Sequence, residues 1–255
     1  MRKPITIGPM TQDLPSLGMD FPHWQDAVEA AIGSGNLEVT GEVRGGQLVQ
    51  FTDNSGAQIN ILAVEPFATW AGFTSTTAAL AHIQMVNDVV ALCDLVTQDG
   101  KVQASITCNL AQGPLLVDEP TLQWEQLALS ALAVQTQNYA DSAAFQSEHG
   151  SEPQPMLVSQ GAMLIASGSG AAAPDASAAL TGIVQEATYR TNKLTGQRFI
   201  HATLEAPSFL DVCLPDGELP QKGSIIAGTV MLTGSILPPA GCGDSCGSCG
   251  GGCGH

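Results

Sequence analysis

The sequence predicts a mainly β protein of the α+β class, with two β-rich units of antiparallel meander or small-barrel type, few helices and a flexible C-terminal tail rich in Gly and Cys. Runs rich in β-branched residues recur along the chain, and Gly-containing turns separate them, which is typical of antiparallel strands. Apolar residues make up 44% of the 255 residues, enough to bury a substantial core. We therefore expect a globular, β-rich protein.

The first expected element is a short amphipathic helix in DFPHWQDAVEAAIGSG, residues 20–35. Pro22 suits its first turn, and Gly33 and Gly35 end it. Apolar residues at helical spacing share one face, namely Trp24, Ala27, Val28 and Ala31. This pattern predicts a helix that buries one side.

Strands are expected next, in LEVTGEV, QLVQFTD and AQINILAVE. Gly45-Gly46 and the turn sequence DNSG separate them, which predicts an antiparallel meander. A tight hairpin is expected in VVALCDLVTQDGKVQASITCNL, because Asp99-Gly100 supplies the positive φ angles of its turn. Cys93 and Cys108 lie on its two strands, where we expect small buried side chains.

Two segments allow more than one assignment. Residues 75–90 carry apolar residues at helical spacing, namely Leu80, Ile83, Val86 and Val90. Ile83 and Met85 also fit a strand, and we favour a helix for the first half. Residues 119–139 fit either a helix that starts at a Pro or an alternating strand, and both assignments stay open.

Composition divides the chain into four parts. Residues 1–141 form a β-rich domain with an N-terminal helix, and 142–179, rich in Ser, Gly, Pro and Ala, form a linker or long loop in which MLVSQGAMLIA makes a strand or two. Residues 180–237 form a small β-barrel-like unit, and 238–255 form the Cys-rich tail. The similar patterns of residues 39–65 and 180–205 raise the alternative that the β-rich parts are duplicated.

Charge and hydropathy limit the partners. Acidic residues outnumber basic ones 24 to 8, giving a formal net charge of −16, which disfavours phosphate backbones and anionic membranes. The sequence shows no secretory signal and no apolar run long enough to cross a membrane. We expect a cytoplasmic protein without membrane or nucleic-acid contacts, whose partner is another protein or a second copy of itself.

The strongest functional signal is the C-terminal GCGDSCGSCGGGCGH. Four thiols and a histidine follow the spacing C-x3-C-x2-C-x3-C-x-H, namely Cys242, Cys246, Cys249, Cys253 and His255. Thiolates bind Zn²⁺ tetrahedrally, and the intervening glycines permit the sharp turns that a short metal-binding peptide needs. The spacing predicts a metal site for zinc, with Cu(I) or an iron–sulfur cluster as alternatives.

The chain contains no complete catalytic motif, so we expect a non-enzymatic protein that binds or delivers a metal through its tail, with the β-rich part as an interaction or assembly module. One alternative is a thiol–disulfide carrier that uses Cys246 and Cys249. Another is a polymer- or nucleic-acid-binding barrel of the oligonucleotide/oligosaccharide-binding type. That alternative depends on a basic and aromatic cluster, Tyr189, Arg190, Lys193, Arg198 and Phe199.

Other possible sites are weaker. GSGAAA, residues 168–173, matches a loose dinucleotide-binding pattern, but Pro174 interrupts the helix that should follow. The remaining histidines are scattered, namely His23, His82, His149 and His201. We expect these imidazoles to be solvated or hydrogen-bonded within the fold, with His201 facing solvent from its strand.

Overall fold

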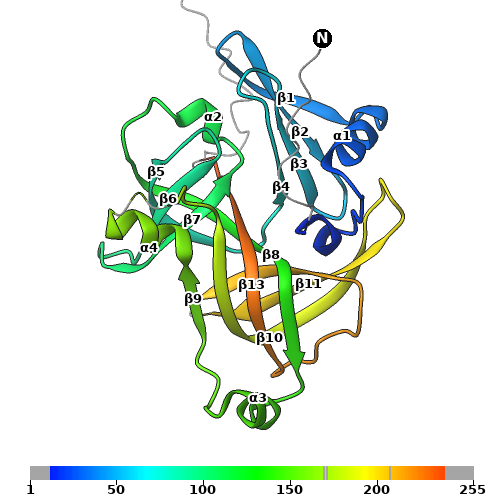
Figure 1. Cartoon of the computed structure of the whole chain (residues 1–255), viewed down its shortest axis with the longest axis vertical. Coiled ribbons are helices and arrows are strands. Elements are labelled where there is room, and N and C mark those ends of the chain that lie inside the picture. The colour runs from blue at the N-terminus through cyan, green and yellow to red at the C-terminus, as the bar shows by residue number, and fades with distance from the viewer. Residues whose placement is uncertain (1–11, 169, 171, 207, 239–255) are drawn as a thin grey trace, which may run out of the picture.

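The computed structural model describes residues 12–238 except 169, 171 and 207, and it confirms a mainly β fold (Figure 1). Within the described residues, the strands form a four-stranded sheet, β1-β2-β3-β4, and a nine-stranded sheet, β11-β12-β8-β5-β6-β7-β13-β10-β9. The first sheet is antiparallel throughout, and the second is mixed.

The four-stranded sheet and its helices come from the first third of the chain. Their bounds are η1 Leu14–Leu17, α1 Trp24–Gly33, β1 Leu37–Val43, β2 Gly46–Thr52, β3 Ala57–Leu62 and β4 Ala68–Phe73. The predicted helix and three-stranded meander are therefore confirmed. Helix α1 buries Ala27 and Ala31, so its apolar face packs inward as its spacing indicates.

The nine-stranded sheet takes up the rest of the described chain. Its strands are β5 Ala78–Met85, β6 Val90–Val96, β7 Val102–Leu110, β8 Leu122–Tyr139, β9 Met156–Ser159, β10 Ser177–Thr191, β11 Arg198–Glu205, β12 Phe209–Pro215 and β13 Ile225–Ile236. Three helices lie between them, α2 Gly113–Leu116, α3 Ser142–His149 and α4 Gln160–Ser167. The hairpin predicted around Asp99-Gly100 is confirmed as β6–β7.

Two further strand pairings, β10 with β11 and β8 with β13, close this sheet into two rings within the described residues. One ring is β8-β5-β6-β7-β13, and the other is β13-β10-β11-β12-β8. Each ring contains a three-stranded meander, β5-β6-β7 in the first and β10-β11-β12 in the second. The first strand of each meander pairs antiparallel with one long strand, β5 with β8 and β10 with β13. The third strand pairs parallel with the other long strand, β7 with β13 and β12 with β8. The two rings therefore share β8 and β13 and have the same connectivity.

The helix expected for the first half of residues 75–90 is wrong, because this part of the chain enters strand β5. Both edges of β5 are hydrogen-bonded, with Leu80 opposite Val96 of β6 and Ala78 opposite Ala128 of β8. Pairing on both sides overrides a short helical periodicity. Residues 119–139, which allowed two assignments, form the long strand β8.

Residues 142–179, expected as a linker or long loop, contain helix α3, strand β9, helix α4 and the start of β10. Side chains cap both helices, since Asp141 accepts from the Ala144 N–H and Ser159 accepts from the Ala162 N–H. The compositional boundaries at 141/142 and 179/180 thus fall inside the nine-stranded sheet. Among the described helices, none combines the length and the apolar character needed to span a bilayer.

The two stretches considered as a duplication have different topologies. Residues 39–65 cover three strands, β1 to β3, whereas residues 180–205 cover the two strands β10 and β11. The internal similarity of this fold instead relates β5–β8 to β10–β13, which have matching strand pairings.

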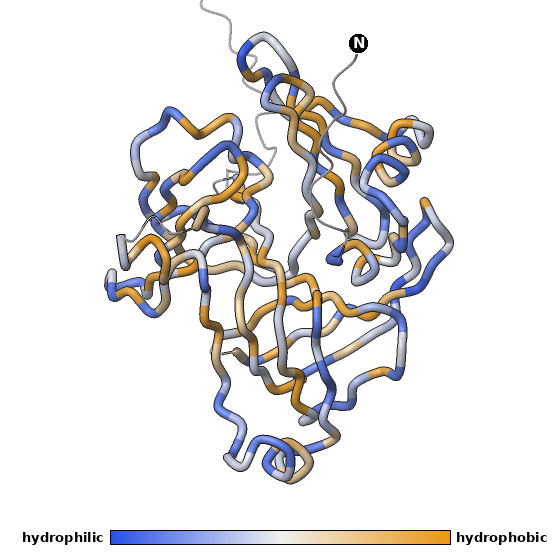
Figure 2. The backbone as a smooth tube through the Cα atoms, viewed as in Figure 1, coloured by the Kyte–Doolittle hydropathy of each residue, from blue (hydrophilic) through white to orange (hydrophobic). Residues whose placement is uncertain are grey.

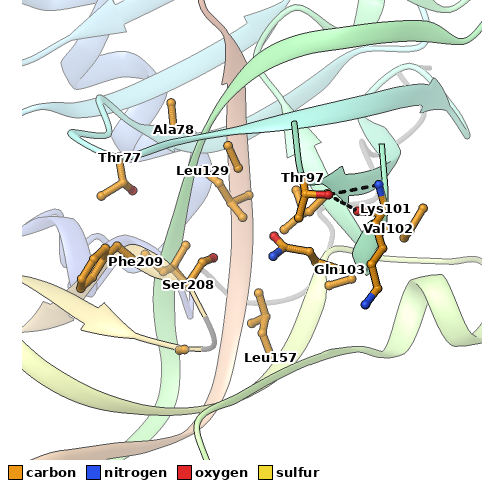
Figure 3. Close-up of a pocket in the computed structure, with 15 residues that line it drawn as sticks. Thr77, Ala78, Thr97, Lys101, Val102, Gln103, Leu129, Leu157, Ser208 and Phe209 are labelled. Carbon is orange, nitrogen blue, oxygen red and sulfur yellow. Dashed lines mark hydrogen bonds between the residues drawn. The ribbon is translucent and has the colours of Figure 1, made fainter. Parts of the chain in front are cut away.

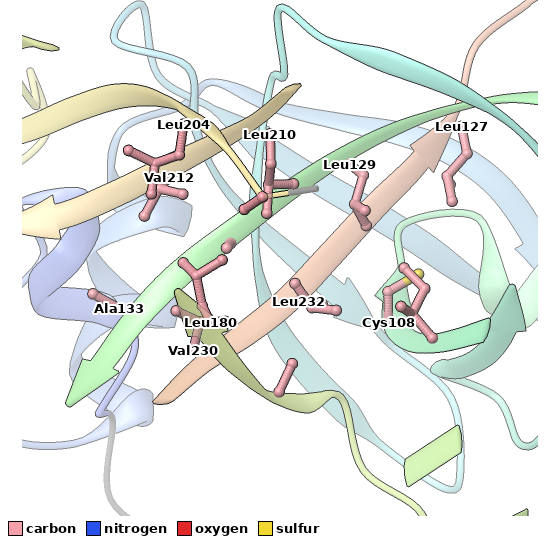
Figure 4. Packing of buried hydrophobic residues seen from close by; sticks show 14 of the residues in the cluster. Cys108, Leu127, Leu129, Ala133, Leu180, Leu204, Leu210, Val212, Val230 and Leu232 are labelled. Atoms are coloured by element: carbon pink, nitrogen blue, oxygen red, sulfur yellow. The ribbon is translucent and has the colours of Figure 1, made fainter. Parts of the chain in front are cut away.

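The main core lies inside the two rings, and hydrophobic residues follow the strands that cross the middle of the molecule (Figure 2). Figure 4 shows part of this core around β8 and β13. A second cluster joins η1, α1 and the four-stranded sheet to three side chains of the second ring, Leu132 of β8, Phe199 of β11 and Cys213 of β12. Apolar burial therefore holds the small sheet against the second ring.

Candidate functional site

The predicted metal ligands Cys242, Cys246, Cys249, Cys253 and His255 lie outside the described residues. Within the described part of the chain, no group of three or more His, Cys, Asp or Glu side chains could hold a metal ion. The metal prediction therefore depends on the tail sequence.

The three cysteines of the folded body are free and buried, and they are Cys93, Cys108 and Cys213. The Sγ atoms of Cys93 and Cys108 lie 3.7 Å apart. Hydrogen bonding to Cys108, together with burial, raises the pKa of the Cys93 thiol, and burial raises the pKa of Cys213. Because the thiolate is the reactive and metal-binding form, Cys93 and Cys213 are poor ligands and nucleophiles.

We expect the body thiols to react with a thiol reagent at neutral pH only after the protein unfolds. Burial blocks access to Cys93, Cys108 and Cys213, and the raised pKa values of Cys93 and Cys213 disfavour their thiolates. Thiol titration of a chain truncated after Pro239 measures this, because that chain keeps only these three cysteines. Rapid reaction of any of them in the native truncated protein would contradict the prediction.

A buried polar network surrounds Asp211 of β12, whose side chain is 0% exposed. One carboxylate oxygen accepts from the Ser75 hydroxyl at 2.7 Å and from the Thr77 N–H at 3.0 Å. The other accepts from the Thr76 hydroxyl at 2.9 Å, and His201 Nε2 lies 2.9 Å from it. Asp211 thus anchors the connection between β4 and β5, which links the two sheets.

His201 is buried and hydrogen-bonded, contrary to the solvent-facing position expected from its strand. Its Nδ1 lies 3.0 Å from Arg190 Nη2, and a guanidinium can only donate. Nδ1 therefore accepts, and Nε2 carries the proton that it donates to Asp211. Arg190 also donates to the Ser55 carbonyl at 2.8 Å, so the network reaches the β2–β3 turn.

Burial alone raises the pKa of Asp211, but hydrogen bonds from His201, Ser75 and the Thr76 N–H outweigh burial and hold this pKa well below its ordinary value. A Ser–His–Asp catalytic set needs the hydroxyl to face the imidazole. Here Ser75 donates to the carboxylate, and both ring nitrogens of His201 are engaged. The arrangement anchors the chain around Asp211, and neither ring nitrogen of His201 is left to accept a proton from the Ser75 hydroxyl.

The basic and aromatic cluster does not form one exposed surface. Phe199 is buried and Arg190 turns inward to His201. At the surface, the Arg198 guanidinium lies over the Tyr189 ring at 4.0 Å and pairs with Asp216 at 2.8 Å. Lys193 uses its backbone N–H to donate to Asp53. The stacked aromatic platform required for single-stranded nucleic acid is therefore not assembled by these residues.

A cavity of about 390 Å³ lies where the two rings meet. The β6–β7 hairpin supplies Thr97, Lys101 and Gln103 on one side, and the β11–β12 hairpin supplies Ser208 and Phe209 on the opposite side (Figure 3). These two hairpins correspond to each other, because each is formed by the second and third strands of the meander in its ring. The cavity thus lies between corresponding hairpins, over the shared strand β8.

The chemistry of the cavity is mostly apolar. Its inner wall contains the buried side chains Leu95, Leu129, Ala206 and Leu210. At its mouth, Val102 is 49% exposed and Phe209 is 64% exposed. Among the described lining residues, Lys101 is the only charged group.

Comparison with protein-family models, curated proteins and solved structures gave no match.

Sequence reasoning missed both Asp211 and the cavity. An acid inside the apolar run FLDVCLP was a usable signal for Asp211, because a buried carboxylate requires several hydrogen-bond partners. The turn at Asp99-Gly100 was visible in the sequence, but nothing local indicates that Ser208 and Phe209 lie opposite it.

Proposed function

We propose that the chain is a non-enzymatic protein that binds or delivers a metal ion, with Zn²⁺ as the ion and Cu(I) or an iron–sulfur cluster as alternatives. The tail supplies the ligands, Cys242, Cys246, Cys249 and Cys253, with His255 as a further donor. The observation that carries the proposal is the spacing of these residues in a glycine-rich segment.

The properties of the folded body support a metal site in the tail and not in the body. Its cysteines are buried, and its described residues form no cluster able to hold a metal. We therefore expect the tail cysteines, and not those of the folded body, to supply the thiolate ligands for a metal. Thiols must lose their protons to bind a metal, so the metal affinity of these cysteines depends on pH and on competing thiols. This behaviour suits delivery to a partner better than a rigid structural site.

The β-rich body serves in this proposal as the module that recognises another protein or a second copy of the chain. The proposed location is the cytoplasm, where thiols stay reduced. The last described strand, β13, remains tied to the sheet up to Leu237, whose N–H donates to the Gln126 carbonyl at 2.8 Å. Removing the tail after Pro239 therefore leaves every strand of the body intact.

The test is elemental analysis of the untagged full chain, purified under reducing and anaerobic conditions, beside the chain truncated after Pro239. We expect close to one equivalent of metal in the full chain and none in the truncated chain. Cys246→Ala and Cys249→Ala variants should lower the metal content, because each removes a thiolate ligand. A visible absorption band would distinguish an iron–sulfur cluster from zinc.

The matched control is Cys213→Ala, which removes a buried thiol of the body and is expected to keep full metal content. Equal metal content in the full and truncated chains would overturn the proposal. So would two metal-free chains that differ by four reactive thiols. In that case, the redox potential of Cys246 and Cys249 becomes the measurement that tests the thiol–disulfide alternative.

A further inference from the structure

We infer that the cavity between the two rings binds a small amphipathic carboxylate, with its aliphatic part inside and its carboxylate at Lys101. None of the described residues that line this cavity belongs to the proposed metal-binding tail. The cavity volume of about 390 Å³ falls in the range of roughly 300–1,000 Å³ typical of small-ligand pockets.

The apolar part of the ligand is recognised by the inner wall. Leu95, Leu129 and Leu210 are almost fully buried, and their side chains line the cavity. Leu157 of β9 lies across from Leu129 (Figure 3). An aliphatic chain placed between them removes apolar surface from water on both partners, which favours binding.

The charge of the lining selects an anion. The chain carries three times as many acidic as basic residues, yet no acidic side chain is among the described residues that line the cavity. Within the described structure, the Lys101 ammonium has no hydrogen-bond or ion-pair partner, whereas Arg44 and Arg198 are both paired with aspartates. A carboxylate is the complementary head group for this ammonium.

The polar groups around Lys101 are positioned by the turn. Thr97 Oγ1 accepts from the Lys101 N–H at 3.1 Å and lies 3.2 Å from the Lys101 carbonyl oxygen (Figure 3). Its hydroxyl also donates to the Asp99 carboxylate. These bonds fix the backbone from which the Lys101 side chain extends. Gln103 and Ser208, on opposite sides of the cavity, offer further hydrogen-bond donors to a carboxylate.

Trp124 provides a built-in reporter. A Cβ placed on Gly100 would lie 3.2 Å from the Trp124 ring, so the indole packs over the same turn that carries Lys101. Because this side chain is 47% exposed, ligand binding at the turn should change its emission.

The test titrates the full chain with decanoate, below its micelle concentration, by calorimetry and tryptophan fluorescence. We expect saturable one-to-one binding that weakens at high salt. Lys101→Gln should weaken decanoate binding about fivefold, as expected for a partly exposed ion pair, and should leave binding of uncharged decanol unchanged. Lys222→Gln, an exposed lysine outside the cavity, is the matched control and should have no effect.

The cavity itself is tested by Ala78→Phe, which places a large side chain in its lining and should abolish binding of both ligands. Phe209→Ala is the second variant, because removing an exposed side chain should preserve folding while weakening both ligands. Non-saturable decanoate binding, or equal affinities of Lys101→Gln and Lys222→Gln for decanoate, would overturn the inference. Neither result depends on the metal content of the tail, so the two proposals fail separately.

Discussion

Replacing Asp211 with Asn is expected to lower the free energy of unfolding by about 3–5 kcal/mol, the usual cost of removing one partner from a buried charged network. The carboxylate satisfies donors from Ser75, Thr76 and Thr77 as well as His201. The amide of Asn would turn its own N–H groups towards some of these donors. The connection between the two sheets would then lose its anchor.

Urea denaturation of the wild-type and Asp211→Asn proteins measures this effect. The control is Asp216→Asn, which breaks the exposed pair with Arg198 and is expected to cost less than about 1 kcal/mol. If both variants lost the same small amount of stability, Asp211 would not be the anchor that we describe.

The same network predicts a pH dependence. The pKa of Asp211 is lower in the folded protein than its ordinary value, which is about 3.9 in an unfolded chain. Its contribution is therefore complete above about pH 4 and is lost as the pH falls through the lower folded pKa. We expect the stability difference between wild type and Asp211→Asn to shrink below about pH 4. A constant difference from pH 7 to pH 2 would contradict this prediction.

A second large effect is expected at Gly228, where β13 pairs with both β8 and β10. Gly228 has a φ of 145°, and a Cβ there would lie 2.1 Å from the Gln135 carbonyl oxygen. Gly228→Ala therefore combines backbone strain with a clash against the neighbouring strand. We expect a loss of about 3–5 kcal/mol in unfolding free energy.

Gly223→Ala is the matched control for this change. Gly223 also has a positive φ, 87°, but an added Cβ would meet nothing within 4 Å. The control should lose only the conformational cost of about 1–2 kcal/mol. Thermal or urea unfolding measures the loss of unfolding free energy in both variants, and the difference between them is the cost of the clash with β8. Equal losses would refute the close approach of β8 and β13 at Gly228.

Local signals were sufficient where an element depends on its own residues. The β6–β7 hairpin was predictable because Asp99-Gly100 favours the positive φ that its turn adopts at Gly100. Helix α1 was predictable because its apolar residues share one face. The apolar spacing wrongly favoured a helix for the first half of residues 75–90, because β5 is stabilised by β6 and β8 and not by its own periodicity.

The candidate sites show the same limit. The tail is recognisable as a thiol-rich peptide because its ligands are adjacent in sequence. Asp211 contacts Ser75 across 136 positions, and Lys101 lies across the cavity from Ser208 and Phe209. Such contacts are set by strand pairing between distant segments, which leaves no short-range signal.

The sequence by itself determined the β-rich class, the acidic character, the early helix and meander, the tight hairpin and the spacing of the tail thiols. Only the tertiary structure decided that β8 and β13 are shared by two rings, that His201 is buried beside Asp211, and that a cavity opens between corresponding hairpins. The reason is physical, because turns and helix faces depend on neighbouring residues, whereas ring closure and buried networks depend on hydrogen bonds between strands far apart in the chain.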